Sequence, residues 1–194
     1  MVAYTASVIA LLAASAAALP TNLKLAKRCT GPAVNQATLT LTENSEGLVD
    51  TAYQDPTGHW TIGYGHLCGA AECTDVQYSQ PLSTAAGQAL LQGDLGTAQD
   101  CITNETGENV VLNANEYGAL VDWAFNEGCG NVASSTLISR LNNGEDPQTV
   151  IGQELPQWVY SDGQELPGLV TRRKNEVNLA NTATSAGALP VGNC

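Results

Sequence analysis

The clearest periodic pattern of apolar and polar positions lies between Asn113 and Glu127. Apolar side chains recur there at three- and four-residue intervals, at Tyr117, Leu120, Val121, Ala124 and Phe125. This spacing places them on one face of a helix. Asn113 and Glu116 have the form of a capping box, and Gly128 supplies a stop. The pattern predicts a helix over residues 113–127 whose apolar face lies in the core.

Other segments have weaker helical patterns. One runs from Ser83 to about Asn104, although its three glycines each weaken a helix by up to about 1 kcal/mol relative to alanine. Shorter helices are predicted from residue 134 or 135 to residue 143, and from Pro147, capped by Asp146, to Pro156. A last helix is predicted to start near Leu166.

Two segments have the periodicity of strands. Residues 38–42 read Thr-Leu-Thr-Leu-Thr, and this alternation with period two predicts a strand. Pro56-Thr57-Gly58 is turn chemistry, and the run from His59 to Gly65 after it reads as a hairpin strand loosened by two glycines.

The chain begins with a leader. Residues 1–18 form a short apolar run that ends in small residues, which is typical of a signal peptide cleaved after Ala18 and too short for a membrane span. Residues 19–28 end in Lys27-Arg28 and are interpreted as a pro-segment, with an unprocessed tail as the alternative. The remaining residues, 29–194, suit one domain in a secreted, extracellular protein.

Without the leader the chain is strongly acidic. Its only strong bases are Arg140, Arg172, Arg173 and Lys174, against nineteen aspartates and glutamates, which gives a formal charge of −15. Such a charge argues against a nucleic-acid partner, and no membrane partner is expected. The basic cluster 172–174 is expected to pair with neighbours such as Glu176 and Asp162. Contact with carboxylates of a substrate is the alternative.

The chain contains six cysteines. An even count in a secreted chain predicts three disulfides, for which 15 pairings are possible. A zinc site at Cys68 and Cys73 is the competing interpretation, but no second close pair of ligands follows them. We expect no metal and no organic cofactor.

Two acids lie next to the predicted turn and strand, with Glu46 before the small sheet and Asp55 at its edge. Cleavage of a glycosidic bond needs one carboxylic acid to protonate the leaving oxygen and one carboxylate to activate water or to attack the sugar. Their separation of nine residues does not by itself distinguish such a pair from two solvated surface acids.

The residues around these acids are more specific. Glu-Gly-Leu at 46–48, Tyr-x-Asp at 53–55 and Gly-x-x-Thr-Ile-Gly-x-Gly-His at 58–66 closely resemble the catalytic segment of phage-type lysozymes, glycoside hydrolase family 24. Phe-Asn-x-Gly at 125–128 and Leu-Pro-Gly-Leu-Val at 166–170 extend the resemblance to about residues 36–181, most of the chain after residue 28. It implies that Glu46 is the general acid and that Asp55 and Thr61 hold the hydrolytic water.

The resemblance also implies a fold and further site residues. The fold is α+β and mainly helical, with a small β-hairpin lobe and a larger helical lobe across a cleft. Residues before Gly47 would form a helix, contrary to their period-two pattern, with a shielded Glu46 on its last turn. Substrate contacts are implied at Leu67, Phe125 and Asn126, and a structural pair at His66 and Asp94.

These expectations describe a monomeric secreted lysozyme. Its substrate would be bacterial peptidoglycan, cleaved by inversion at the β-1,4 bond between N-acetylmuramic acid and N-acetylglucosamine. A chitin-type hydrolase and a wall-binding defence protein without turnover are the alternatives. On this fold the predicted disulfides are Cys68–Cys73, Cys101–Cys129 and Cys29–Cys194.

Overall fold

The computed structural model describes residues 29–192. The expected signal peptide, the expected pro-segment and Cys194 lie outside these residues. The longer helices are α1 (Gln36–Glu46), α2 (Thr84–Asp94), α3 (Gly96–Glu105), α4 (Ala114–Glu127) and α8 (Pro167–Ala180). The shorter helices are α5 (Cys129–Ala133), α6 (Thr136–Asn142) and α7 (Pro147–Glu154), with 3-10 turns η1 (Ala71–Cys73) and η2 (Leu155–Gln157).

The strands form three small antiparallel sheets. The strands are β1 (Val49–Gln54), β2 (Trp60–Gly63), β3 (His66–Leu67), β4 (Leu112–Asn113), β5 (Tyr160–Ser161), β6 (Gln164–Glu165) and β7 (Gly187–Leu189). They pair as β1-β2-β3, β4-β7 and β5-β6. The fold is therefore the expected mainly helical α+β fold.

Helix α4 forms the centre of the molecule and packs against α1, α3 and α8. Its start is the predicted capping box between Asn113 and Glu116, and Gly128, with φ of 79°, ends it. Every residue from Asn115 to Ala124 is buried, whereas the sequence predicted burial of one face only. Neighbouring helices cover α4 on several sides, so its polar residues must find partners inside the protein.

Residues 36–46 form helix α1, so the strand predicted from their alternating pattern is wrong and the helix implied by the resemblance is confirmed. Thr38, Leu41 and Thr42 are buried at positions i, i+3 and i+4. The core-facing side of α1 is therefore largely made of threonines, which the period-two alternation disguised. A Cβ atom at Gly118 of α4 would overlap the Thr38 hydroxyl, so the glycine permits the close approach of the two helices.

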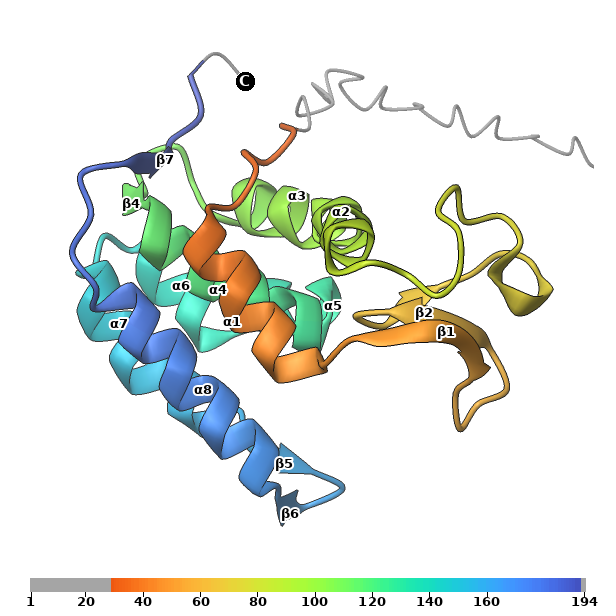
Figure 1. Ribbon diagram of the computed structural model, residues 1–194. Helices are drawn as coiled ribbons and strands as arrows, with labels where there is room; N and C mark the ends of the chain where they lie inside the picture. The colour runs from red at the N-terminus through yellow and green to blue at the C-terminus, as the bar shows by residue number, and fades with distance from the viewer. Residues whose placement is uncertain (1–28, 193–194) are drawn as a thin grey trace, which may run out of the picture.

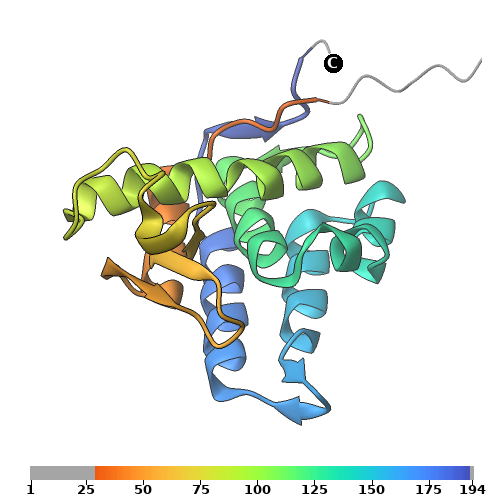
Figure 2. The same ribbon diagram turned by 90° about the vertical axis from the view of Figure 1, so that its right-hand side faces the viewer.

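The sheet β1-β2-β3 lies at the C-terminal end of α1, apart from the helices that surround α4 (Figures 1 and 2). Its small core contains Ile62, Cys73 and Leu82. Helices α2 and α3 run along one side of the molecule from this sheet to the helical part (Figure 2). The single helix predicted for this segment is divided at Leu95, between Gly93 and Gly96.

Two of the predicted disulfides are present. Cys68 is bonded to Cys73, which excludes the zinc interpretation, and Cys101 of α3 is bonded to Cys129 of α5. The third prediction, Cys29–Cys194, ends on a residue outside the described part of the chain. Between residues 29 and 192 no helix is both long and apolar enough to cross a membrane.

Candidate active site

Glu46 is the last residue of α1, where Gly47, with φ of 75°, ends the helix and donates its N–H to the Glu43 carbonyl. The side chain of Glu46 is 27 % exposed, and its Oε1 atom accepts a hydrogen bond from Arg172 Nη1 at 2.6 Å. The environment therefore differs from the shielded one expected from the sequence, because a guanidinium of α8 contacts the carboxyl group directly.

Arg172 is in turn held by a buried carboxylate. Its Nε and Nη2 atoms donate to Asp122 Oδ2 and Oδ1 at 2.9 and 3.0 Å, and Asp122 is fully buried in α4. Thr42 of α1 donates its hydroxyl to the same carboxylate at 2.7 Å. Burial lowers the pKa of Arg172, whereas the carboxylates of Asp122 and Glu46 raise it. As a result the pKa of Arg172 stays above its usual value. A permanent positive charge therefore faces Glu46.

Asp55 lies in the turn that follows β1. Its Oδ1 atom accepts three hydrogen bonds, from the Thr57 N–H and hydroxyl, both at 2.8 Å, and from the His59 N–H at 2.9 Å. The His59 N–H and the Thr57 hydroxyl hold the pKa of Asp55 below its usual value, since they bind the carboxylate better than the acid. Asp55 is therefore fixed in place and ionised near neutral pH.

Thr61 is on β2, paired with Tyr53 of β1 and with Leu67 of β3. It is only 3 % exposed, and its hydroxyl donates to the His59 carbonyl at 3.2 Å. The His59 backbone thus joins Asp55 to Thr61, because its N–H and its carbonyl bind one side chain each. With its proton engaged, the Thr61 hydroxyl retains lone pairs that can accept a hydrogen bond.

His66 and Asp94 form the expected pair. The Nδ1 atom of His66 lies 2.8 Å from Asp94 Oδ1, and both side chains are about one quarter exposed, at 23 and 26 %. The contact connects β3 to the end of α2. His59, by contrast, is 70 % exposed.

The residues expected to contact substrate lie on two different parts of the fold. Leu67 on β3 is 64 % exposed. Phe125 is partly buried against the main core near the end of α4, and the exposed Asn126 accepts a hydrogen bond from Arg173 Nη2 at 2.9 Å. Leu67 is therefore on the sheet side with Asp55 and Thr61, and the other two are on the helical side.

The basic cluster 172–174 pairs within the protein at its first two positions. Arg173 Nη1 lies 3.1 Å from Glu127 Oε1, and its Nη2 lies 2.7 Å from Glu176 Oε1. Burial raises the pKa of Glu176 well above its usual range, and the charge of Arg173 opposes this shift. Pairing with Glu176 was predicted from the sequence. The contacts of Arg172 with Glu46 and Asp122 were not, although a charged residue inside the apolar pattern of residues 113–127 was a signal for a buried partner.

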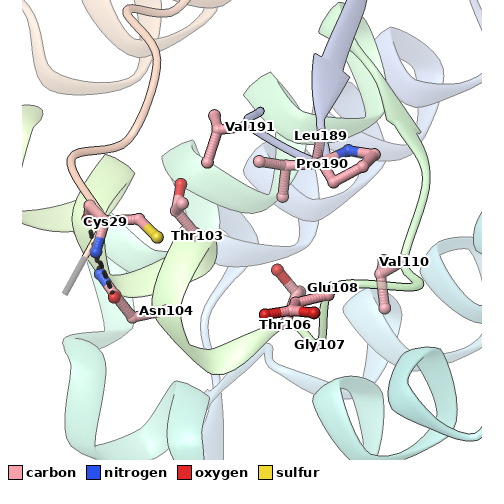
Figure 3. Close-up of a pocket in the computed structure, with 10 residues that line it drawn as sticks. All are labelled: Cys29, Thr103, Asn104, Thr106, Gly107, Glu108, Val110, Leu189, Pro190 and Val191. Atoms are coloured by element: carbon pink, nitrogen blue, oxygen red, sulfur yellow. Dashed lines mark hydrogen bonds between the residues drawn. The ribbon is translucent and has the colours of Figure 1, made fainter. Parts of the chain in front are cut away.

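A cavity of about 300 Å³ lies on another part of the molecule. It is lined by Cys29, the end of α3, residues 106–110 and residues 189–191, and Figure 3 shows the side chain of Asn104 hydrogen-bonded to the backbone of Cys29 at its edge. None of the lining residues belongs to segment 46–66, so this cavity is separate from the candidate catalytic residues.

Comparison with known proteins places the chain in a family. Residues 43–176 match the phage lysozyme family. The chain is 34 % identical over 153 residues to an endolysin of Bacillus phage PZA, and 30 % identical over 147 residues to a SAR-endolysin of Enterobacteria phage PA-2. These matches cover 78 and 76 % of this chain, and 56 and 79 % of the relatives.

A solved structure is also similar. The muramidase domain of SpmX from Asticaccaulis excentricus superposes with a TM-score of 0.65 at 30 % sequence identity, covering 77 % of this chain and 98 % of that domain. The chain therefore belongs to the phage lysozyme family. It spans about half the length of the Bacillus phage relative.

Proposed function

We propose that the protein is a secreted glycoside hydrolase that cleaves bacterial peptidoglycan as a lysozyme. The bond cleaved is the β-1,4 bond between N-acetylmuramic acid and N-acetylglucosamine. The observation that carries the proposal is that segment 46–66 of this family member combines a helix-terminal Glu46 with an Asp55 that three donors hold as a carboxylate. A carboxyl group to protonate the leaving oxygen and a carboxylate to activate water are the two parts that glycosidic hydrolysis needs.

Glu46 donates a proton to the leaving oxygen of the sugar. As it does so, its carboxyl group becomes a carboxylate, and the Arg172 guanidinium, 2.6 Å from Oε1, stabilises the charge that develops. Arg172 is available at that position because Asp122 fixes its other face. The contact with Arg172 therefore stabilises the Glu46 carboxylate that remains after the proton has been transferred.

Asp55 orients a water molecule toward the anomeric carbon. Its Oδ1 atom is occupied by the turn, which leaves Oδ2 to accept a hydrogen bond from that water. The Thr61 hydroxyl, oriented by the His59 carbonyl, accepts a second one. As the glycosidic bond to the leaving oxygen breaks, this water attacks from the opposite face and one of its protons passes to Asp55, which inverts the anomeric centre.

The proposal also includes secretion of the protein and its action as a monomer. Two disulfides support an oxidising destination, in agreement with the apolar run at residues 1–18. The dibasic pair before Cys29 supports removal of residues 19–28, which leaves a domain of residues 29–194, and we propose that this domain acts as a monomer.

The test follows the products of hydrolysis. Purified protein should clear a suspension of bacterial cells, and NMR of fresh oligosaccharide product should show the α-anomer first from the β-linked substrate. The β-anomer appearing first would contradict the role of water held by Asp55. Degradation of chitin without clearing of cells would favour the chitin-type alternative, and binding to walls without any product would favour the non-catalytic one.

A further inference from the structure

One face of the sheet β1-β2-β3 carries a row of three side chains that crosses all three strands. Tyr53 of β1 pairs with Thr61 of β2, and Thr61 pairs with Leu67 of β3. Residues directly opposite each other in antiparallel strands place their side chains on the same face of the sheet. Tyr53 and Leu67 therefore flank Thr61 on both sides, and with strands about 4.8 Å apart the row is about 10 Å long.

The opposite face of the sheet is occupied by the small core. Ile62, next to Thr61 along β2, is fully buried there, and Trp60 and Ala52 pack against the same core. Successive residues of a strand point to opposite faces, so the face with Tyr53 and Leu67 is not the one that this core uses. Trp60, the tryptophan of the hairpin, therefore packs against this core on the face opposite to Tyr53 and Leu67.

The two flanking side chains remain accessible to a ligand. Tyr53 is 38 % exposed and Leu67 is 64 % exposed, whereas Thr61 between them is 3 % exposed. Tyr53 is also near the end of β1, two residues before Asp55. A polymer that binds along this face of the sheet, beside Asp55 and Thr61, therefore lies within reach of these two side chains.

We propose that Tyr53 is a substrate-contact residue whose ring packs against the apolar face of an N-acetylated sugar, on the side of Thr61 opposite the expected contact residue Leu67. The inference rests on the proposed function. A tyrosine suits this task because its ring offers a rigid apolar surface and its hydroxyl can hydrogen-bond at the edge. Such anchors commonly supply a large share of binding energy at a surface.

The experiment measures KM and kcat separately on a soluble oligosaccharide of alternating N-acetylglucosamine and N-acetylmuramic acid. Tyr53→Ala should raise KM by about tenfold with kcat changed less than about threefold, because the ring binds substrate without taking part in the proton transfer. Tyr53→Phe keeps the ring and should stay within about twofold of the wild-type KM. Tyr160→Ala is the matched control, since Tyr160 is a more exposed tyrosine, at 61 %, on β5.

The outcomes separate this inference from the proposed function. An unchanged KM in Tyr53→Ala, together with loss of turnover in Glu46→Gln, overturns the sugar contact and leaves the proposed function in place. No turnover by the wild-type protein overturns both. If Tyr53→Ala does not fold, Tyr53→Leu replaces it, and the same rise in KM supports the contact while a wild-type KM contradicts it. A tenfold rise in Tyr160→Ala also contradicts it.

Discussion

The two carboxylates of the candidate site are held in contrasting ways. Asp55 is held by its own turn, because all three donors to its Oδ1 atom come from Thr57 and His59, two and four residues further along the chain. Glu46 is held by Arg172, which is 126 residues away in the sequence. Arg172 is held in turn by Asp122, which precedes it by 50 residues. One arrangement is local and the other exists only when α1, α4 and α8 are packed together.

This difference separates the two chemical tasks. The pKa of Asp55 is lowered mainly by the His59 N–H and the Thr57 hydroxyl, and only slightly by the exposed His59 imidazole 3.9 Å from Oδ2, so Asp55 remains ionised and can bind water through that oxygen. An arginine fixed by a second, buried carboxylate gives Glu46 a charged partner whose position depends on the core. Changes on the helical side should therefore affect both activity and folding, and changes in the turn should affect the pH dependence with little effect on folding.

The largest effect is expected from Glu46→Gln. The substitution preserves the shape of the side chain and removes the proton donor, so turnover on soluble oligosaccharide should fall by about 10²–10⁴-fold. Glu145→Gln is the matched control, because Glu145 also accepts from an arginine, Arg140, at 2.7 Å, and should retain turnover within about twofold. Turnover of Glu46→Gln above one tenth of the wild-type value, in the presence of an intact fold, would show that another group donates the proton.

Asp122→Asn should have the next largest effect, this time on stability. It leaves the Arg172 side chain, which is 7 % exposed, without the carboxylate that binds two of its nitrogens. Breaking a buried ion pair from one side costs about 3–5 kcal/mol, so the free energy of unfolding from urea titration should fall by an amount in that range.

The control for Asp122→Asn is Glu145→Gln. It removes a partner of Arg140 at 2.7 Å in a pair whose side chains are 45 and 24 % exposed, so the free energy of unfolding should stay close to the wild-type value. Equal losses in the two variants would refute the idea that the buried carboxylate is what holds the arginine.

The smallest effect is expected from Thr57→Ala, in the turn. The pKa of Asp55 is lowered by the His59 N–H and by the Thr57 hydroxyl, so loss of the hydroxyl raises it toward the ordinary value of 3.8. Asp55 then takes up its proton at a higher pH, and the acid side of the pH–activity profile should move upward while activity near neutral pH stays within about twofold. The stability of the fold should change in the same direction. A carboxylate with a lowered pKa stabilises the fold until the pH falls through that pKa, so Thr57→Ala should lose this contribution at a higher pH than the wild type.

Thr149→Ala provides the control for the turn. The N–H and hydroxyl of Thr149 bind Asp146 Oδ2 at 2.9 and 2.7 Å, the same arrangement at the start of α7. Its pH–activity profile should coincide with that of the wild type. Coincidence of the Thr57→Ala profile with both would mean that the hydroxyl does not tune Asp55.

Much of the fold could be predicted from the sequence where local signals agree. The capping box at Asn113, the helix it starts, the turn at 56–58 and the pairing of Cys68 with Cys73 all follow from residues close together in the chain. The short sheets β4-β7 and β5-β6 were not predicted, because strands of two or three residues carry too little periodicity to read. The period-two alternation of residues 38–42 wrongly predicted a strand where α1 lies. The core-facing side of α1 contains Thr38 and Thr42, and Thr42 binds Asp122 of α4.

By itself, the sequence determined the turn that holds Asp55 and the central helix that starts at Asn113, and its resemblance to the phage lysozyme family pointed to the two candidate acids. The turn and the helix depend on hydrogen bonds and apolar spacing within a few residues. Only the tertiary structure decided what faces Glu46, because the Arg172 guanidinium has to be buried between α1, α4 and α8 and matched there by Asp122. A buried charge is tolerated only with its partners in place, and those partners meet only when the helices have packed.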